Sequence, residues 1–141
     1  MALLDRAGRI KPCGGAIPPK LVEEFAIPPS LMVAQVHGAR IVAPSERRVD
    51  MPIEGGYVGM VDREEFDEWL RRRAAINGAE RVEGTFTDFS RDAAGNAVVH
   101  FETRANGKGT LTAKAVIGAD GANSGVARAA LLPTRQGAVS G

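Results

Sequence analysis

The sequence of 141 residues is poor in the residues that build metal sites and disulfides: it has one cysteine and two histidines. One cysteine excludes an internal disulfide, and His37 and His100 lie too far apart in the sequence to give a metal-ligand spacing. Long apolar runs are missing too, because residues 31–34 and 115–117 are far shorter than the roughly 20 residues of a membrane-spanning helix. We therefore expect no metal site and no transmembrane segment in this chain.

An excess of charge of one sign is also lacking. Eighteen basic and 17 acidic side chains leave a net charge of +1, which provides no broad field to attract nucleic acid. The first residues carry charges at Asp5 and Arg6 and lack the apolar core of a signal peptide, so a cytoplasmic location is expected. With 44% hydrophobic and 25% charged residues, the composition is that of an ordinary globular domain.

The first 61 residues predict short strands and a long loop. Residues 2–5 are typical of the end of a buried strand, and glycines and prolines make residues 7–30 mostly loop, with a short helix at 20–25. Between residues 35 and 61, apolar residues alternate with polar ones as in strands. Gly55 and Gly56 predict a hairpin turn before "YVGMV".

The segment "DREEFDEWLRRRAAINGAE" predicts the clearest helix. Asp62 is a good N-cap, Glu65 completes a capping box, and Gly78 provides the stop. Apolar residues recur at helical spacing at Phe66, Trp69, Leu70 and Ala74.

The C-terminal half predicts a change from antiparallel to parallel structure. "RVEGTFTDF", "AVVHFET" and "GTLTA" are separated by turn signals and indicate an antiparallel meander. Residues 115–119 are apolar without alternation, which favours a strand buried on both faces of a parallel sheet. A helix is expected to begin near Ser124.

Two acidic residues stand at ends of these strands. Ligands of open parallel sheets bind outside the carboxyl ends of the strands, so Asp120 and Gly121 could hold a nucleotide cofactor, although Asp-Gly is also a common turn. Asp5 has the place of a ribose-binding acid, but the glycine-rich fingerprint that should precede such an acid is missing from the sequence. A simple surface charge is the alternative for Asp5.

Arg63 is in the first turn of the clearest helix, where the helix dipole disfavours a cation. An anionic partner resolves this conflict, and the candidates are a phosphate or one of three nearby side chains, Glu64, Glu65 and Asp67.

The stretch "KPCGGA" places Cys13 before two glycines. Cys13 could be a nucleophile, a redox thiol or a packing residue, and no histidine is tied to it by a local pattern. Gly14 and Gly15 permit a sharp turn and close contact with a flat ligand.

Three segments together resemble the flavin-dependent geranylgeranyl reductases, especially those of bacteriochlorophyll synthesis: "LLDRAGRIKPCGGAIPPKL", "RRVDMPIEGGYVGMVDREEFDEWLRRRAA" and "AVIGADGANSGVAR". The resemblance covers about residues 2–131. "PCGGA" and "GMVDREEFDEWLR" are specific for these reductases. Asp120 and Gly121 are shared more widely with the superfamily of p-hydroxybenzoate hydroxylase.

The resemblance implies an α/β fold, a partial Rossmann-type FAD-binding domain with an antiparallel meander and an inserted β unit that covers the substrate. Residues 1–34 and 62–131 would then belong to the FAD-binding domain, residues 35–61 to the substrate-domain sheet, and residues 132–141 would be a loose tail. The implied cofactor-binding residues are Asp5 at the ribose, Arg63 near the flavin, Asp120 and Gly121 beside the pyrophosphate, and Gly14 and Gly15 along the isoalloxazine.

The implied reaction uses FAD and, as electron source, NADPH to reduce an isolated alkene of an isoprenoid or pigment ester, with Cys13 or a bound water as the candidate proton donor. The resemblance also implies an internal fragment that binds FAD poorly and is inactive alone, and a complete enzyme that associates peripherally with a photosynthetic membrane. Two alternatives remain, a flavin monooxygenase or halogenase on the same scaffold and a non-catalytic binding module.

Overall fold

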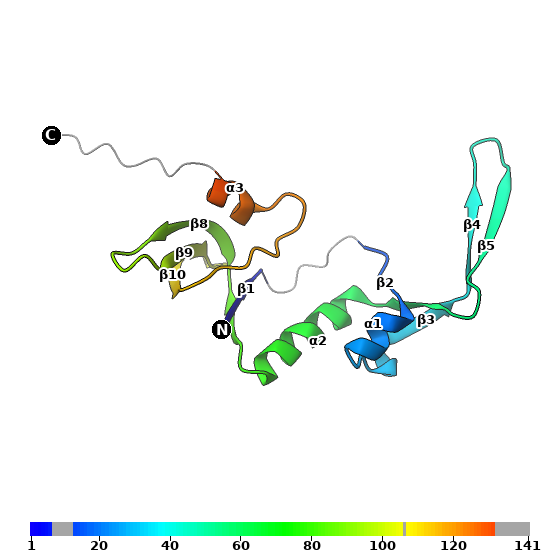
Figure 1. Ribbon diagram of the computed structural model, residues 1–141, viewed down its shortest axis with the longest axis horizontal. Helices are drawn as coiled ribbons and strands as arrows, with labels where there is room; N and C mark the ends of the chain where they lie inside the picture. The colour runs from blue at the N-terminus through cyan, green and yellow to red at the C-terminus, as the bar shows by residue number, and fades with distance from the viewer. Residues whose placement is uncertain (7–12, 106, 132–141) are drawn as a thin grey trace. The chain divides into compact units, whose positions relative to one another are not determined.

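The computed structural model describes residues 1–6, 13–105 and 107–131 (Figure 1). The chain divides into two compact units, Met1–Ala7 with Gly78–Gly141 and Gly8–Asn77. The expected tail at residues 132–141 and the first two residues of "KPCGGA" lie outside the described residues. Within the described part of the chain, no helix has the length and apolar character of a membrane span.

The first unit begins with a pair of parallel strands. Strand β1 (Ala2–Asp5) runs beside β7 (Glu80–Glu83), with Ala2 opposite Glu80 and Asp5 opposite Glu83. This confirms the strand expected at residues 2–5. The parallel pairing of two strands so distant in the sequence is typical of an α/β sheet.

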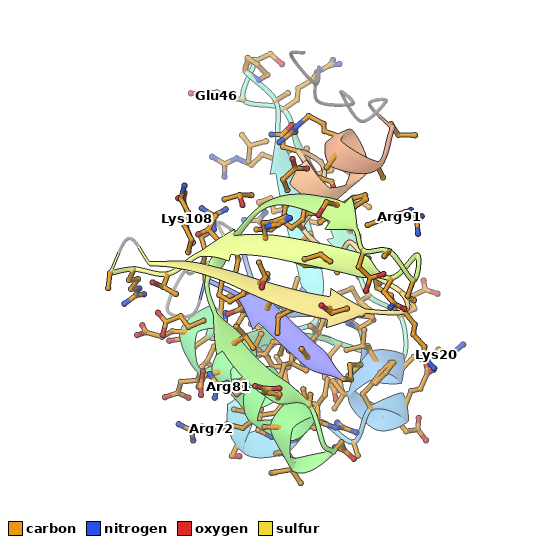
Figure 2. All side chains as sticks on the ribbon, turned by 90° about the vertical axis from the view of Figure 1, so that its left-hand side faces the viewer. Lys20, Glu46, Arg72, Arg81, Arg91 and Lys108 are labelled. Atoms are coloured by element: carbon orange, nitrogen blue, oxygen red, sulfur yellow. The ribbon has the colours of Figure 1, made fainter. Side chains whose placement is uncertain are left out.

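A three-stranded antiparallel meander follows directly. Strands β8 (Thr85–Arg91), β9 (Ala97–Glu102) and β10 (Lys108–Ala113) are ordered β10-β9-β8, and Figure 2 shows Arg91 and Lys108 at opposite ends of this sheet. The expected meander is therefore confirmed, but its first segment is divided by Gly84 between β7 and β8. The Phe101 ring packs over Gly84 and Gly109, where an added Cβ would lie 2.5 and 2.4 Å from ring atoms.

The buried strand expected at residues 115–119 is wrong for this structure. These residues form no strand, and Ile117 is 88% exposed. A strand buried on both faces needs hydrogen-bonded neighbours, and within the described residues the parallel sheet consists of β1 and β7. Helix α3 (Gly125–Leu131) follows, as expected near Ser124.

The second unit is built around a small antiparallel sheet and two helices. Strand β6 (Val58–Val61) lies between β2 (Ala16–Ile17) and β3 (Met32–Val36). Helix α1 (Pro19–Glu24) and the 3₁₀ helix η1 (Pro29–Leu31) connect β2 to β3, and α2 (Arg63–Ile76) follows β6. The buried core consists of Ile17, Ile27, Val61 and Phe66.

The pairing expected around Gly55 and Gly56 is wrong. Strand β4 (Gly38–Val42) forms a hairpin with β5 (Arg48–Pro52), whereas β6 pairs with β2 and β3. The β4–β5 turn is closed by a hydrogen bond from the Ala43 N–H to the Arg47 oxygen, 2.9 Å. Alternation along the sequence identifies these strands but does not specify their partners, which explains the error.

Helix α2 has the expected bounds. The Asp62 carboxylate accepts a hydrogen bond of 2.8 Å from the Glu64 N–H, and Gly78 has a φ of +87° just after the helix. Toward its C-terminal end, Arg73 donates to the carbonyl oxygen of Phe25 and lies 5.2 Å from the centre of the Trp69 ring. Arg73 therefore ties the end of α1 to α2.

The two glycines after Cys13 have different surroundings. Gly15 is buried with a φ of +71°, its carbonyl oxygen accepts from the Val61 N–H at 2.9 Å, and an added Cβ would lie 2.2 Å from the Val61 oxygen. Gly14 is exposed, and an added Cβ would meet no atom within 4 Å. Gly15 is thus required by the fold, while Gly14 leaves an open face on the loop.

Replacement of Arg73 by methionine keeps most of the aliphatic stem but removes the hydrogen bond to Phe25 and the cation over Trp69. We expect Arg73→Met to lower the free energy of unfolding by about 1–2 kcal/mol. Arg72→Met is the matched control, because Arg72 is exposed and its pair with Glu68 should contribute only about 0.3–0.5 kcal/mol. Urea unfolding followed by fluorescence of Trp69, the single tryptophan, measures both. Equal effects of the two changes would contradict the assigned role of Arg73.

Replacement of Gly15 by alanine should strain both the positive φ and the contact with the Val61 oxygen. We expect Gly15→Ala to destabilise the chain by roughly 1–3 kcal/mol in the same unfolding experiment. Gly14→Ala should change the free energy of unfolding by less than about 0.5 kcal/mol. A Gly15→Ala chain as stable as the Gly14→Ala chain would show that this loop is not held as described.

Candidate functional site

The thiol of Cys13 lies beside the N-terminal end of α2. Cys13 is exposed, and hydrogen bonds from the Gly15 N–H and then from the Arg63 guanidinium lower the pKa of its thiol. Gly15 is anchored to β6, and Arg63 is the first residue of the helix that follows this strand. The fold therefore brings Cys13, Gly14, Gly15 and Arg63 together in one unit.

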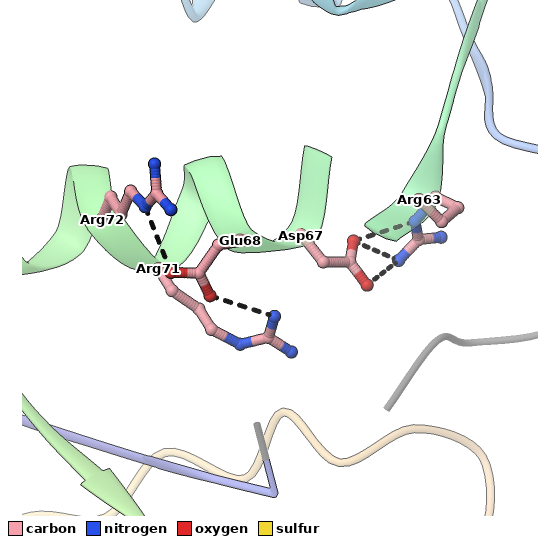
Figure 3. A network of polar contacts seen from close by, with 5 residues as sticks. All are labelled: Arg63, Asp67, Glu68, Arg71 and Arg72. Carbon is pink, nitrogen blue, oxygen red and sulfur yellow. Dashed lines mark hydrogen bonds and ion pairs between the residues drawn. The ribbon is translucent and has the colours of Figure 1, made fainter. Parts of the chain in front are cut away.

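Arg63 takes Asp67 as its anionic partner among the three side chains considered. Its Nε and a terminal nitrogen donate to the two carboxylate oxygens of Asp67 at 2.8 and 2.9 Å (Figure 3). The two side chains are only 20% and 12% exposed, so solvent screens this pair less than a surface pair. Hydrogen bonding to Asp67 raises the pKa of Arg63, which remains a cation. This ion pair resolves the conflict with the helix dipole.

A second group of charges on α2 is separate from this pair. Glu68 lies 3.8 Å from an Arg71 nitrogen and 3.2 Å from the Arg72 Nε (Figure 3). Neighbouring carboxylates on one helix thus serve different arginines.

The Asp120 carboxylate holds the start of α3. It accepts hydrogen bonds from the Ser124 hydroxyl at 2.5 Å, from the Gly125 N–H at 2.6 Å and from the Val126 N–H at 3.1 Å. These bonds, with the one from Ser124 first, lower the pKa of Asp120. Gly121 follows with a φ of +87° and no atom within 4 Å of an added Cβ. The turn interpretation of this dipeptide therefore has a clear structural basis.

Asp5 ends β1 at the carboxyl end of the parallel pair. Its side chain is half-buried, and its carbonyl oxygen accepts from the Gly84 N–H at 2.9 Å. Asp5, Asp120 and Gly121 belong to the first unit, whereas the residues around Cys13 belong to the second.

Both histidines make local contacts. His37 Nδ1 lies 3.1 Å from the Gly56 oxygen, and His100 Nε2 lies 2.9 Å from the Ser90 hydroxyl. Within the described residues, no group of three or more His, Cys, Asp or Glu side chains could hold a metal ion.

Sequence reasoning did not include two residues that shape these sites. Val61 places Gly15 through its backbone, and Ser124 holds the Asp120 carboxylate. For Ser124 the sequence does contain a signal, an aspartate and a serine four residues apart before a helix. Val61 leaves no signal, because it acts through its backbone N–H and carbonyl, which almost any residue has.

Comparison with known proteins identifies relatives over most of the chain. A family model described as FAD binding domain matches residues 16–139. The chain is 56% identical over 127 residues to geranylgeranyl diphosphate reductase of Rhodobacter capsulatus, covering 89% of this chain and 32% of the relative. It is 44% identical to the chloroplastic geranylgeranyl diphosphate reductase of Nicotiana tabacum, covering 84% and 28%. The chain thus spans about 30% of the length of these relatives, and the resemblance seen in the sequence is confirmed.

Solved structures share the fold at low sequence identity. The crystal structure of FqzB matches with a TM-score of 0.66 and 24% identity, covering 92% of this chain and 32% of that protein. A flavoprotein/dehydrogenase from Cytophaga hutchinsonii matches with a TM-score of 0.57 and 20% identity, covering 79% and 30%. The expected α/β class, a partial Rossmann-type FAD-binding fold with an antiparallel meander, is confirmed. With its family model matched from residue 16 to 139, the chain belongs to the FAD binding domain family.

Proposed function

We propose that this chain serves in an FAD-dependent reductase that hydrogenates isolated C=C bonds of a geranylgeranyl group, with NADPH as the electron source. The observation that carries the proposal is the 56% identity to a geranylgeranyl diphosphate reductase across 89% of the chain. The proximity of Cys13 to Arg63 supports it, because it brings together the two segments that resemble the reductases most specifically, the loop with Cys13 and the start of α2 with Arg63.

The described residues fit a flavin dinucleotide. An added Cβ at Gly14 would meet no atom within 4 Å, which leaves room for contact with a flat ring. The Arg63 cation suits an anionic ligand. The open backbone at Gly121 likewise permits close approach of a ligand. The cofactor-binding residues proposed from the family relation are Gly14, Gly15 and Arg63 in the second unit and Asp5, Asp120 and Gly121 in the first. When bound, FAD supplies the redox chemistry that protein side chains lack.

Cys13 is the proposed proton donor. An isolated alkene is unpolarised, so its reduction requires a proton at one of its two carbons. General acids work best with a pKa near the working pH, and the Gly15 N–H and Arg63 shift the pKa of the Cys13 thiol down from its ordinary value, toward neutrality. Exposure of Cys13 makes its proton available at the surface of the loop.

The remaining assignments follow from the same family relation. We assign residues 1–34 and 62–131 to the FAD-binding domain and residues 35–61 to the sheet that covers the substrate. The substrate is a small isoprenoid, either geranylgeranyl diphosphate or a pigment ester. The complete enzyme associates peripherally with a membrane, because both substrates carry a long apolar geranylgeranyl chain.

A product assay tests the proposed activity. The complete enzyme, supplied with FAD, NADPH and geranylgeranyl diphosphate or a geranylgeranylated pigment, should yield products heavier by two hydrogens for each bond reduced. A mass spectrum identifies them. Oxygen-dependent addition of one oxygen atom to an aromatic substrate would instead establish the monooxygenase alternative.

Replacement of Cys13 by serine tests the proton donor. If Cys13 is a general acid, Cys13→Ser should reduce alkene hydrogenation by about 10²–10⁴-fold, because a hydroxyl is a far weaker acid than a thiol. Binding of FAD, followed by its absorbance, should stay unchanged and serves as the internal control. Hydrogenation at the original rate would reduce Cys13 to a packing residue.

A further inference from the structure

Arg63 lies between two acidic groups of different kinds. Cys13 lies two residues before Gly15, whose carbonyl oxygen accepts from the N–H of Val61, two residues before Arg63, so the pairing of β2 with β6 places Cys13 next to Arg63. The Asp67 carboxylate lies one helical turn after Arg63 in α2 and pairs with it. The ion pair with Asp67 is bidentate, with nitrogen–oxygen distances of 2.8 Å for Nε and 2.9 Å for the terminal nitrogen. A bidentate ion pair fixes both the position and the plane of a guanidinium, whereas a single hydrogen bond leaves the plane free to rotate.

The location of Arg63 gives Asp67 a specific task. The first turn of a helix carries partial positive charge from the unsatisfied N–H groups, so an arginine there is repelled from the helix end. Asp67 opposes this repulsion from a largely buried position, with 12% of its side chain exposed. Without that carboxylate, the long flexible arginine side chain has little reason to remain near the helix and Cys13.

We propose that Asp67 is a positioning residue that holds the Arg63 guanidinium against Cys13. The relevance of this positioning to catalysis rests on the proposed function, in which Cys13 donates the proton and Arg63 lies near the flavin. The placement itself is a property of this chain and is testable without cofactor or substrate.

A purely electrostatic role of Asp67 predicts the opposite behaviour of Cys13. The charged groups that act on Cys13 from α2 are Arg63, which lowers the pKa of the thiol, and Asp67, which raises it through space. If Asp67 only neutralised charge, its removal would lower the pKa of Cys13 further. If Asp67 positions Arg63, its removal releases the guanidinium, and the pKa of Cys13 rises. The sign of the change therefore separates the two roles.

The experiment measures the rate of iodoacetamide alkylation of Cys13 against pH, using the 141-residue chain, in which this is the only cysteine. In Asp67→Asn the pKa of Cys13 should rise toward the value found in Arg63→Met. The alkylation rate at neutral pH should fall roughly three- to tenfold, since the thiolate fraction changes tenfold for each unit of pKa. An unchanged or lowered pKa in a folded Asp67→Asn chain would overturn the proposal.

Matched variants separate positioning from general damage. Glu68→Gln removes the neighbouring carboxylate, which pairs with Arg71 and Arg72, and should leave the thiol titration unchanged. Arg63→Lys keeps the positive charge but loses the bidentate pair with Asp67, and should raise the pKa of Cys13 as Asp67→Asn does. Trp69 fluorescence checks that α2 is folded.

If Asp67→Asn does not fold, Asp67→Glu provides the decisive variant. It keeps the charge and moves the carboxylate by one methylene, so positioning predicts a raised pKa of Cys13 and a charge effect predicts none. Failure of the product assay with the expected thiol titration would refute the reductase function alone. A contrary titration with successful hydrogenation would refute the role of Asp67 alone.

Discussion

A single backbone contact between Gly15 and Val61 sets the geometry on which the second unit depends. The Val61 N–H donates to the Gly15 oxygen at 2.9 Å, and the Val61 carbonyl occupies the space where any side chain at residue 15 would begin. Val61 itself is part of the buried core, and the chain enters α2 immediately afterwards. The hydrophobic core therefore fixes the distance between a surface thiol and a helix start, although neither group is itself in the core.

Both candidate sites use a carboxylate to complete the start of a helix. Asp120 accepts from N–H groups at the start of α3, and Asp67 holds the arginine at the start of α2. A helix start is rich in N–H groups without helical partners and in positive potential, which a nearby carboxylate compensates. The two carboxylates thus stabilise two helix starts that would otherwise carry uncompensated positive charge.

The sequence contained the local features of this structure but not its long-range pairings. Asp62 and Gly78 marked the bounds of α2, because caps act within a few residues. The partner of β6 and the exposed state of residues 115–119 depend on which strands meet, and alternation does not encode that choice. For the same reason, Cys13 and Arg63 were each recognisable as candidates, while their contact required the pairing of β2 with β6.

Gly84 limits how far the two sheets of the first unit can move independently. One residue separates the last position of the parallel pair from the first position of the meander, and the Phe101 ring lies against it. A joint of one residue, closed by an aromatic ring, has no slack to absorb movement. A displacement of β7 along its own axis would therefore be passed to β8 through this single residue.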